Sequence, residues 1–382
     1  MITLRGAAAQ AGPDDGTVAA PWTSGSSTVV PDQADIDAAA RLLEAGALVA
    51  FPTETVYGLG ADAENPSAVA RIYAAKGRPS QHPLIVHLAP EADIGYWSND
   101  VGGDARALID AFWPGPLTLI LPRAPHVPDA AAGGQHSLGL RCPSHPVAQS
   151  LLRSFKRGRG GVAAPSANRF GQVSPTLARH VRDEFGDSPL LSCVLDGGQS
   201  AVGIESTIID LTRGRPVLLR PGHVSAADIA AVLGVEPALP DADAPRASGT
   251  LASHYAPHTP VVVVPAAAIA ECLSQLARAG RRAALAHHSA LSRFGFVDQD
   301  DAGEPDTPRS SSMNMIAARA AMSDQPAGYA HDFYAVLRRL DLQCADVIIV
   351  EMLPQDPAWQ AVTDRLARAA HGSTSVLASL IG

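Results

Sequence analysis

Apolar residues recur at two spacings along this 382-residue chain, and together the two spacings predict an α/β protein. From 35 to 45 the apolar side chains stand three or four positions apart, as at Ile36, Ala40 and Leu43, which predicts a helix that ends at Gly46. Further periodic segments predict helices at 68–75, 104–112 and 146–155. Short apolar runs predict strands at 47–51, 83–88, 117–121, 138–141, 161–164, 192–196, 206–210 and 216–220.

The composition changes between 239 and 257, where Pro, Asp, Ala, Ser and Gly dominate, and this change predicts a linker. Beyond it, strands alternate with helices, which predicts a small parallel sheet covered by helices. Its strands are expected at 260–264, 282–286 and 346–351, its helices at 266–279, 315–322, 331–340 and 359–370, and a loop at 298–312. We therefore predict a flexible tail (1–28), a larger domain (29–238), a linker (239–258) and a smaller domain (259–382).

The composition narrows the class of protein. With 46% hydrophobic and 18% charged residues, the chain resembles soluble globular proteins. Its formal net charge of −9 argues against a broad surface for nucleic acid, although a local basic site is compatible with it. Its four cysteines are widely separated, so neither a disulfide framework nor a zinc site is expected. No apolar run is long enough to span a bilayer and the N-terminus is a poor signal peptide, so we predict a cytoplasmic protein.

Two segments near the ends of predicted elements combine glycines with polar side chains. Thr53 and Thr55 precede a glycine-rich stretch, where backbone can approach a ligand and hydroxyls can bind a polar metabolite. A turn stabilised by local hydroxyl-to-backbone bonds is the alternative. Lys76 and Arg78 flank a glycine after a predicted helix and suit phosphate oxygens. Cations that offset the helix dipole are the alternative there.

Three further polar residues lie at the ends of apolar segments. His87 is near the end of its strand, where a histidine is more often structural than a ligand. Arg141 ends another strand and, if buried, needs an anion, which either a bound carboxylate or a protein Asp would supply. Glu205 could be a general base, a metal contact or a structural carboxylate.

Small hydroxyl residues and an amide lie on the loop segments 164–168 and 174–176, where ordinary turn and cap chemistry is the alternative to ligand binding. The chain has neither a Gly-x-Ser-x-Gly elbow nor a phosphate-binding loop of the Gly-x-x-x-x-Gly-Lys-Ser/Thr type. A nucleophilic serine and a common nucleotide-binding fold are therefore both disfavoured.

The order of these motifs is more specific than any one of them. Phe51 to Gly60, Lys76-Gly-Arg-Pro79, Ala164-Pro-Ser-Ala-Asn168 and Gly203-Ile-Glu-Ser-Thr207 together resemble the YrdC-type domain of threonylcarbamoyl-adenylate synthases. The resemblance covers residues 28–258, and 346–351 and 364–370 are similar to the second domain of the longer members. It implies a twisted mixed sheet with helices, followed by a smaller Rossmann-like parallel domain.

The resemblance also implies a reaction. L-Threonine, bicarbonate or CO2, and ATP with Mg²⁺ would give threonylcarbamoyl-AMP and pyrophosphate, so the protein would be a nucleotidyltransferase. The product would pass to proteins that transfer the threonylcarbamoyl group to tRNA, with tRNA itself a possible partner and no membrane involved. The nucleophile would come from the substrates, so catalysis would depend on positioning and on cations that neutralise the leaving pyrophosphate.

Site residues follow from the resemblance position by position. Lys76 and Arg78 would act near the phosphates, and no residue is expected to bind a metal directly. Threonine contacts would fall on Thr55, His87, Arg141, Ala164 and Ser206. ATP contacts would fall on Arg78, His82, Ser137, Ser166, Ser174, Arg220 and Tyr255, and His254 and Tyr255 would cover the site from the linker. The chain departs from the family pattern at His82, where Asn is usual, and at Asp356-Pro-Ala-Trp359, which replaces a glycine-rich turn.

Two other functions compete with the synthase. A carbamoyltransferase of hydrogenase maturation shares this type of domain, but this chain has no paired cysteines and no room for that class's additional unit. A double-stranded RNA-binding or ribosome-assembly module would use a concave basic face, against which the net charge weighs.

Overall fold

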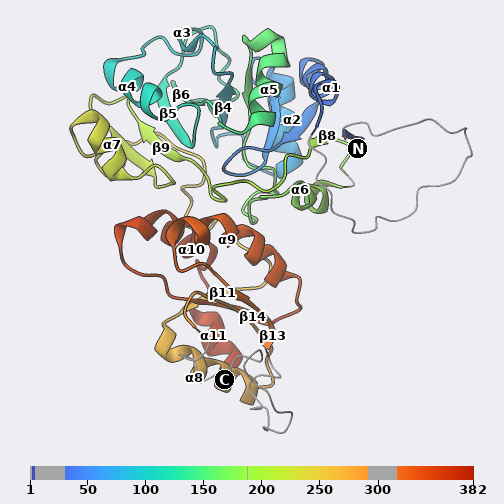
Figure 1. Ribbon diagram of the computed structural model, residues 1–382, viewed down its shortest axis with the longest axis vertical. Helices are drawn as coiled ribbons and strands as arrows, with labels where there is room; N and C mark the ends of the chain where they lie inside the picture. The colour runs from blue at the N-terminus through green and yellow to red at the C-terminus, as the bar shows by residue number, and fades with distance from the viewer. Residues whose placement is uncertain (1, 5–30, 187, 291–315) are drawn as a thin grey trace, which may run out of the picture.

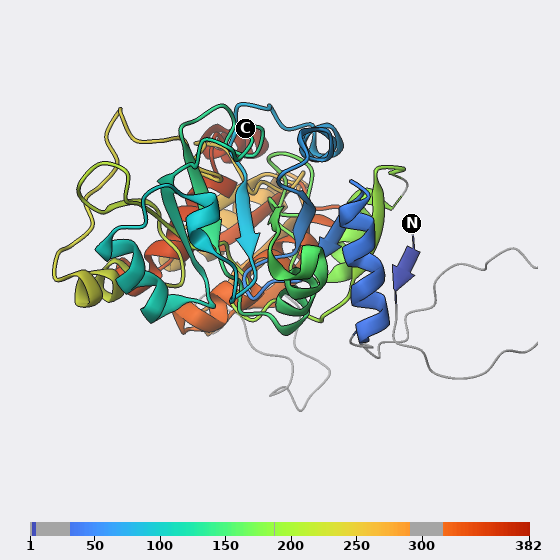
Figure 2. The same cartoon turned by 90° about the horizontal axis from the view of Figure 1, so that it is seen from above.

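The computed structural model of this chain describes residues 2–4, 31–186, 188–290 and 316–382. Within these residues the strands form a sheet of ten strands and a second sheet of four. Figure 1 shows the two sheets in two stacked units, and the view from above shows the smaller unit lying behind the larger one (Figure 2). The predicted fold class is confirmed: a large mixed sheet with helices, and a separate smaller parallel sheet.

The large sheet mixes parallel and antiparallel pairs in the order β1-β8-β2-β3-β7-β4-β6-β5-β9-β10. One parallel register matters for function, because β4 and β6 place His87 directly beside Arg141. The strands are β1 (Ile2–Leu4), β2 (Leu48–Phe51), β3 (Gly58–Asp62), β4 (Ile85–Leu88), β5 (Leu117–Pro122), β6 (Ser137–Arg141), β7 (Gly161–Ala163), β8 (Leu191–Leu195), β9 (Thr207–Asp210) and β10 (Val217–Arg220).

The helices of the larger domain begin and end where local chemistry predicts. α1 starts with a reciprocal capping box between Asp32 and Asp35, a device that contributes about 1 kcal/mol. α2 ends at Gly77, whose φ of 63° is left-handed, and the chain then turns so that Arg78 enters the interior. The helices are α1 (Gln33–Glu44), α2 (Pro66–Lys76), α3 (Ile94–Trp97), α4 (Gly103–Phe112), α5 (Pro146–Ser154), α6 (Ala178–Phe185) and α7 (Ala226–Leu233), with a 3-10 turn at Phe155–Gly158.

The smaller domain has two helical layers around its parallel sheet. Its strands are β11 (Val261–Val264), β12 (Ala283–His287), β13 (Ile316–Ala321) and β14 (Val347–Glu351), in the order β11-β14-β12-β13. α8 (Ala266–Arg278) and α11 (Thr374–Ile381) pack on one face. α9 (Pro326–Asp341) and α10 (Gln360–Ala369, preceded by a 3-10 turn at Pro357–Trp359) pack on the other, which faces the larger domain (Figure 1).

The two domains are in direct contact, and a glycine permits their close approach. Gly203 has a φ of 83°, and a Cβ there would lie 2.3 Å from the carbonyl oxygen of Ala330 in α9. The next residue of α9, His331, donates from its Nδ1 to the carbonyl oxygen of Ala201 at 3.0 Å, and Arg338 pairs with Glu184 at 3.1 Å. The contacts between α9 and the larger domain therefore include backbone packing, a hydrogen bond and an ion pair.

Two predictions of local structure are wrong. Residues 315–322 were expected to form a helix because alanine favours helices, but Ile316–Ala321 forms strand β13. Parallel pairing with β12, in which Ala284 is opposite Ala318, overrides that propensity. The tail was expected to be flexible throughout, whereas Ile2–Leu4 pairs with β8. Residues 5–28 and the predicted loop at 298–312 lie outside the described residues, and the exact domain boundaries stay predictions.

Candidate active site

A pocket lies in the larger domain, where residues of the linker also line it. Nine of the residues predicted to bind substrates line it together: Thr55, Arg78, His87, Arg141, Ala164, Ser166, Ser206, Arg220 and Tyr255. Strands β4, β6 and β10 supply charged or polar side chains from their carboxyl ends, as expected for a site built on a sheet.

The threonine-rich turn after β2 has the local hydroxyl-to-backbone bonds that its sequence allowed. The hydroxyl of Thr53 accepts hydrogen bonds from the backbone N–H groups of Thr55 and Val56, each at 3.2 Å, and donates to the carbonyl of Val56 at 2.6 Å. These bonds fix a local turn. The turn in turn directs the hydroxyl of Thr55 toward Arg141, whose Nη1 lies 2.9 Å away.

Arg141 has its anion within the protein. Its Nη2 lies 2.7 Å from a carboxylate oxygen of Glu54, and both side chains are buried. Its Nε also donates to the carbonyl of Gly115 at 3.3 Å. Of the two options left open by the sequence, a protein carboxylate is therefore the direct partner, and it is Glu54 from the threonine-rich turn rather than an aspartate.

His87 reaches the pocket as a neutral ring. Burial, together with the positive charge of the neighbouring Arg141, lowers its pKa to about 3. Its Nδ1 lies 3.2 Å from the carbonyl oxygen of Ile85. At neutral pH this side chain therefore contributes no charge to the pocket.

Three buried histidines are expected to make the protein less stable in acid. Burial lowers the pKa of His87, His180 and His254 to about 3, from a usual value of 6.5. In the unfolded chain they take up protons as the pH falls through about 6.5, whereas the folded protein keeps them neutral until about 3. Their contribution to stability is therefore complete above about pH 6.5 and is lost progressively below it.

The size of this effect is about 1.4 kcal/mol for each histidine and each pH unit within that window. Urea denaturation at about pH 7.5 and about pH 5.5 measures it, and we expect the midpoint to fall at the lower pH. A midpoint that stays constant over this range would contradict the neutral, buried state of these rings.

Two arginines in the pocket lack a carboxylate partner among the described residues. Arg78 donates to the carbonyl of Pro83 at 2.9 Å and to the hydroxyl of Ser248 at 3.2 Å, and burial lowers its pKa to about 10. Arg220 donates to the carbonyl and hydroxyl oxygens of Ser206 at 3.0 and 3.1 Å. It also donates to the carbonyl of Ser248 at 2.8 Å. Both stay cationic at neutral pH, so the pocket favours an anionic ligand.

The linker closes one side of the pocket. His254 and Tyr255, which the family pattern placed there, line the pocket together with Ser248 and Gly249, which sequence reasoning missed. Gly249 has a φ of 76°, and a Cβ at that position would lie 2.0 Å from the hydroxyl of Tyr255. A Ser-Gly pair in a linker rich in alanine and proline was the available signal, since glycine alone accommodates both constraints.

Four predicted site residues do not line this pocket. Lys76 is buried behind it, where its Nζ donates to the carbonyl of Ser166 at 2.6 Å and also to that of Asn168. Burial lowers the pKa of Lys76. Lys76 thus holds the loop that carries Ser166 in place, and its predicted action near the phosphates stays a prediction.

The other three residues that do not line the pocket have different surroundings. His82 packs against the ring of Phe170, with 5.4 Å between centroids, and Ser137 lines a smaller neighbouring cavity. Ser174 donates its hydroxyl to Glu205 at 2.6 Å. Glu205 lines the pocket, but its carboxylate is bound by protein groups from both domains, as a structural carboxylate would be.

Comparisons with known proteins agree with this geometry. A family model described as "Telomere recombination" matches residues 41–222, and one described as "Threonylcarbamoyl-AMP synthase, C-terminal domain" matches residues 224–371. The threonylcarbamoyl-AMP synthase of Pyrococcus abyssi is 36% identical over 87% of this chain and 92% of its own length. This chain belongs to the threonylcarbamoyl-AMP synthase family.

Other relatives of the synthase family extend the comparison. The Bacillus subtilis threonylcarbamoyl-AMP synthase is also 36% identical, over 87% of this chain and 92% of its own. A putative threonylcarbamoyl-AMP synthase of Mycobacterium tuberculosis is 42% identical over 53% of this chain and 91% of its own. The crystal structure of P. abyssi Sua5 complexed with L-threonine superposes with a TM-score of 0.77 at 34% identity, covering 89% of this chain and 95% of that one.

These similarities confirm the predicted family, fold class and enzyme class, and they favour the synthase over the carbamoyltransferase and RNA-binding alternatives. Neither family model nor any of these relatives tests the roles of single residues.

Two properties of the described residues concern membranes and metal ions. No helix among them is long and apolar enough to cross a membrane, and no group of three or more His, Cys, Asp or Glu side chains among them is placed to hold a metal ion.

Proposed function

We propose that this pocket binds L-threonine beside ATP and joins them, through CO2 or bicarbonate, into threonylcarbamoyl-AMP. One observation carries the proposal. Two buried guanidinium groups that have no carboxylate partner within the described part of the chain, those of Arg78 and Arg220, face the same pocket as a hydroxyl-rich end formed by Thr55 and Ser206. A polyanion and a small polar metabolite are the ligands that such an arrangement suits.

Threonine is proposed to bind at the end formed by β4 and β6. The parallel register of these strands sets His87 beside Arg141, and the turn after β2 adds the hydroxyl of Thr55. Arg141 would attract the substrate carboxylate, although it shares its charge with Glu54. The neutral ring of His87 and the hydroxyl of Ser206 would bind the remaining polar atoms of the amino acid.

ATP is proposed to bind where Arg78 and Arg220 meet the linker. Ser248 now accepts hydrogen bonds from both guanidinium groups, through its hydroxyl and its carbonyl oxygen. Phosphate oxygens are stronger acceptors for an arginine than these neutral groups are. The nucleotide would therefore take over these donors and displace this part of the linker, while Ser166 and Tyr255 line the rest of the site.

The chemical step needs no nucleophile from the protein. The amine of threonine adds to CO2 and loses a proton, which gives a carbamate. A carbamate oxygen then attacks the α-phosphorus of ATP, a new P–O bond forms, and the bond to pyrophosphate breaks. Arg78 and Arg220 would neutralise the charge that gathers on the leaving group.

Mg²⁺ is proposed to enter with the nucleotide. The carboxylate of Glu205, which lines the pocket, already accepts bonds from Ser174, Tyr334 and Arg365, so it has little capacity to bind a metal. Phosphate oxygens and water would then be the metal's ligands, a common arrangement for magnesium. The metal would screen the triphosphate charge together with the arginines.

A test of this function is pyrophosphate release from ATP and bicarbonate, with L-threonine present, replaced by L-serine, or omitted. We expect release to depend strongly on threonine and to stop when a chelator removes Mg²⁺. Mass spectrometry of the reaction should identify threonylcarbamoyl-AMP. Comparable release without threonine would refute the proposed reaction, because it would indicate simple hydrolysis of ATP.

The destination of the product is part of the same proposal. Threonylcarbamoyl-AMP carries an activated acyl phosphate that water can hydrolyse, so a rapid acceptor is needed. We propose that tRNA threonylcarbamoyl-transfer proteins of the cytoplasm consume it. Transfer to tRNA after such proteins are added to the assay is the measurement that checks this step.

A further inference from the structure

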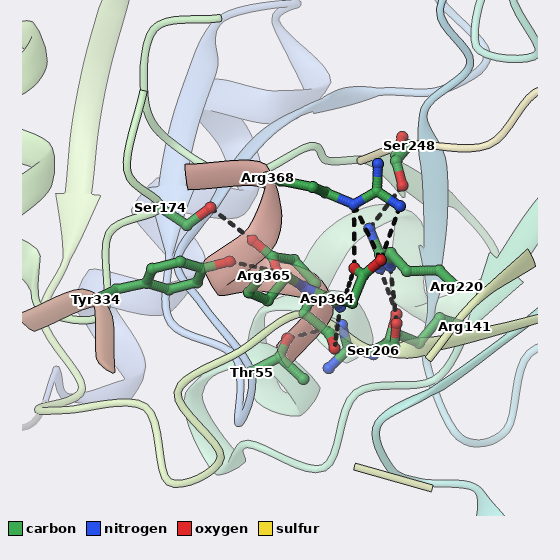
Figure 3. A network of polar contacts seen from close by, with 11 residues as sticks. Thr55, Arg141, Ser174, Ser206, Arg220, Ser248, Tyr334, Asp364, Arg365 and Arg368 are labelled. Carbon is green, nitrogen blue, oxygen red and sulfur yellow. Dashed lines mark hydrogen bonds and ion pairs between the residues drawn. The ribbon is translucent and has the colours of Figure 1, made fainter. Parts of the chain in front are cut away.

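Arg365 belongs to the smaller domain, yet it binds a residue that lines the pocket of the larger one (Figure 3). It lies on α10 and is fully buried. Its Nε donates to the carboxylate of Glu205 at 2.9 Å, and its Nη2 donates to the backbone carbonyl of the same residue at 3.3 Å. One guanidinium group therefore holds both the side chain and the main chain of Glu205.

Glu205 is connected to residues of both predicted substrate-binding regions. Its carboxylate accepts a hydrogen bond from Ser174, a predicted ATP contact, at 2.6 Å. The next residue is Ser206, a predicted threonine contact, whose carbonyl and hydroxyl oxygens hold Arg220. A shift of Glu205 would consequently move the groups that face both substrates.

The carboxylate of Glu205 stays ionised at neutral pH. Burial acts to raise its pKa, but the positive charges of Arg365 and Arg220, with the hydrogen bond from Ser174, outweigh burial and hold the pKa at about 2. Tyr334 of α9 donates a further hydrogen bond to it at 2.8 Å. The carboxylate is thus bound from both domains, and the smaller domain supplies two of its three side-chain donors.

Arg365 also contacts the part of the linker that covers the pocket. Its guanidinium carbon lies 5.6 Å from the centre of the ring of Tyr255, a distance suited to a cation–π contact. Tyr255 lines the pocket and has a φ of 63°, which is uncommon for a residue other than glycine. The same arginine therefore touches the pocket wall and its cover.

Stability alone gives a poor account of this arrangement. A buried ion pair recovers little beyond its own desolvation cost, and apolar residues of the same size often serve as well. Another pair in the same interface, Arg338 with Glu184, joins the domains from a less buried place. Arg338 also donates to the carbonyl of Val173, and neither Glu184 nor Val173 is among the residues that line the pocket. An ion pair that includes a residue of the pocket wall can instead fix the positions of the groups that line the pocket.

We propose that Arg365 is a positioning residue of the active site, so that α10 of the smaller domain completes the site of the larger one. The proposal rests on the proposed function, since the positions concerned are those for ATP and threonine. Displacement of such contacts by about 1 Å commonly lowers catalytic efficiency by up to a hundredfold.

The test compares Arg365→Met with Arg338→Met in the full chain. Both variants remove an arginine that joins the domains, but only the first removes a contact to the pocket. We expect Arg365→Met to lower kcat/KM for threonine-dependent pyrophosphate release by about tenfold to a hundredfold. Arg338→Met should stay within about twofold of the parent, as expected for a pair that supports domain contact only.

A second pair of variants separates positioning from folding. Glu205→Gln should reproduce most of the loss caused by Arg365→Met, and the double variant should lose little more, because both changes break the ion pair between these two side chains. This comparison also decides the matter if Arg365→Met fails to fold. Activity of a folded Arg365→Met within twofold of the parent, equal losses in Arg338→Met, or fully additive losses would each overturn the proposal.

Failure of the proposed function would look different. In that case the unmodified protein itself would release no pyrophosphate in response to threonine, and the positioning role would fall with it. A parent protein that is active and variants that are equally active would instead leave the function standing and refute only the role of Arg365.

Discussion

Replacing Arg220 with alanine is expected to lower kcat for threonine-dependent pyrophosphate release by about a hundredfold to a thousandfold, the usual result of removing a preorganised donor to developing charge. Arg220 is buried, at 3% exposure, and no protein carboxylate among the described residues is in contact with it. Its charge is therefore available to the phosphates of ATP. Removing that charge would mainly destabilise the transition state, because the leaving group becomes more negative there.

Steady-state kinetics of two further variants make this test specific. Arg220→Lys keeps the charge but loses the planar fork, so we expect an intermediate loss. Arg215→Ala, just before the same strand, removes a guanidinium group that is 62% exposed and pairs with Asp241 at the surface. Arg215→Ala should remain fully active. An Arg220→Ala protein with normal kcat would exclude this arginine from the chemistry.

Replacing Arg141 with methionine is expected to reduce the free energy of unfolding by about 3–5 kcal/mol, the cost of leaving one partner of a buried ion pair alone. Arg141 and Glu54 are 4% and 8% exposed and lie 2.7 Å apart. The isolated carboxylate would also keep its bond to the backbone N–H of Ser144, which prevents it from turning toward water. Threonine-dependent activity should be lost with it, because Arg141 lines the pocket.

Urea denaturation followed by tryptophan fluorescence measures this loss, with the double variant Glu54→Gln/Arg141→Met as its control. Because the second change removes the stranded charge, we expect the double variant to regain about half of the lost stability or more. Equal stability of Arg141→Met and the parent would mean that water reaches Glu54. In that event the pair could not be a buried one.

Much of this site could be predicted because the ends of strands can be recognised in the sequence. A polar residue at or near the end of an apolar run, such as His87, Arg141 or Arg220, is placed by the run itself, and all three line one pocket. The family pattern added Ser166 and Tyr255, whose loops have no such periodicity. Glycines marked the places where backbone turns sharply, as at Gly46 and Gly77.

The partners of these residues were much harder to predict. Glu205 and Arg365 are separated by 160 positions, and no local pattern links them. Lys76 was expected near phosphate, but its Nζ donates hydrogen bonds to carbonyl oxygens of a loop 90 residues away. Periodicity reports which side of an element is buried, whereas the identity of the group that it meets there depends on the tertiary fold. The helix predicted around Ile316–Ala321 was wrong for the same reason, because the pairing that makes this segment a strand depends on the tertiary fold.

The contact between Arg365 and Glu205 has a consequence for anyone who shortens this protein. Relatives that match little more than the first half of the chain exist, so the larger domain looks like a module that could be used by itself. In this chain, however, a truncation within the linker would remove Arg365 and Tyr334 from Glu205. It would also expose Val56, Val173 and Ile204 of the larger domain, which belong to one apolar cluster with residues of α9 and α10. The point at which the sequence is easiest to cut is therefore not a point at which the enzyme divides into independent parts.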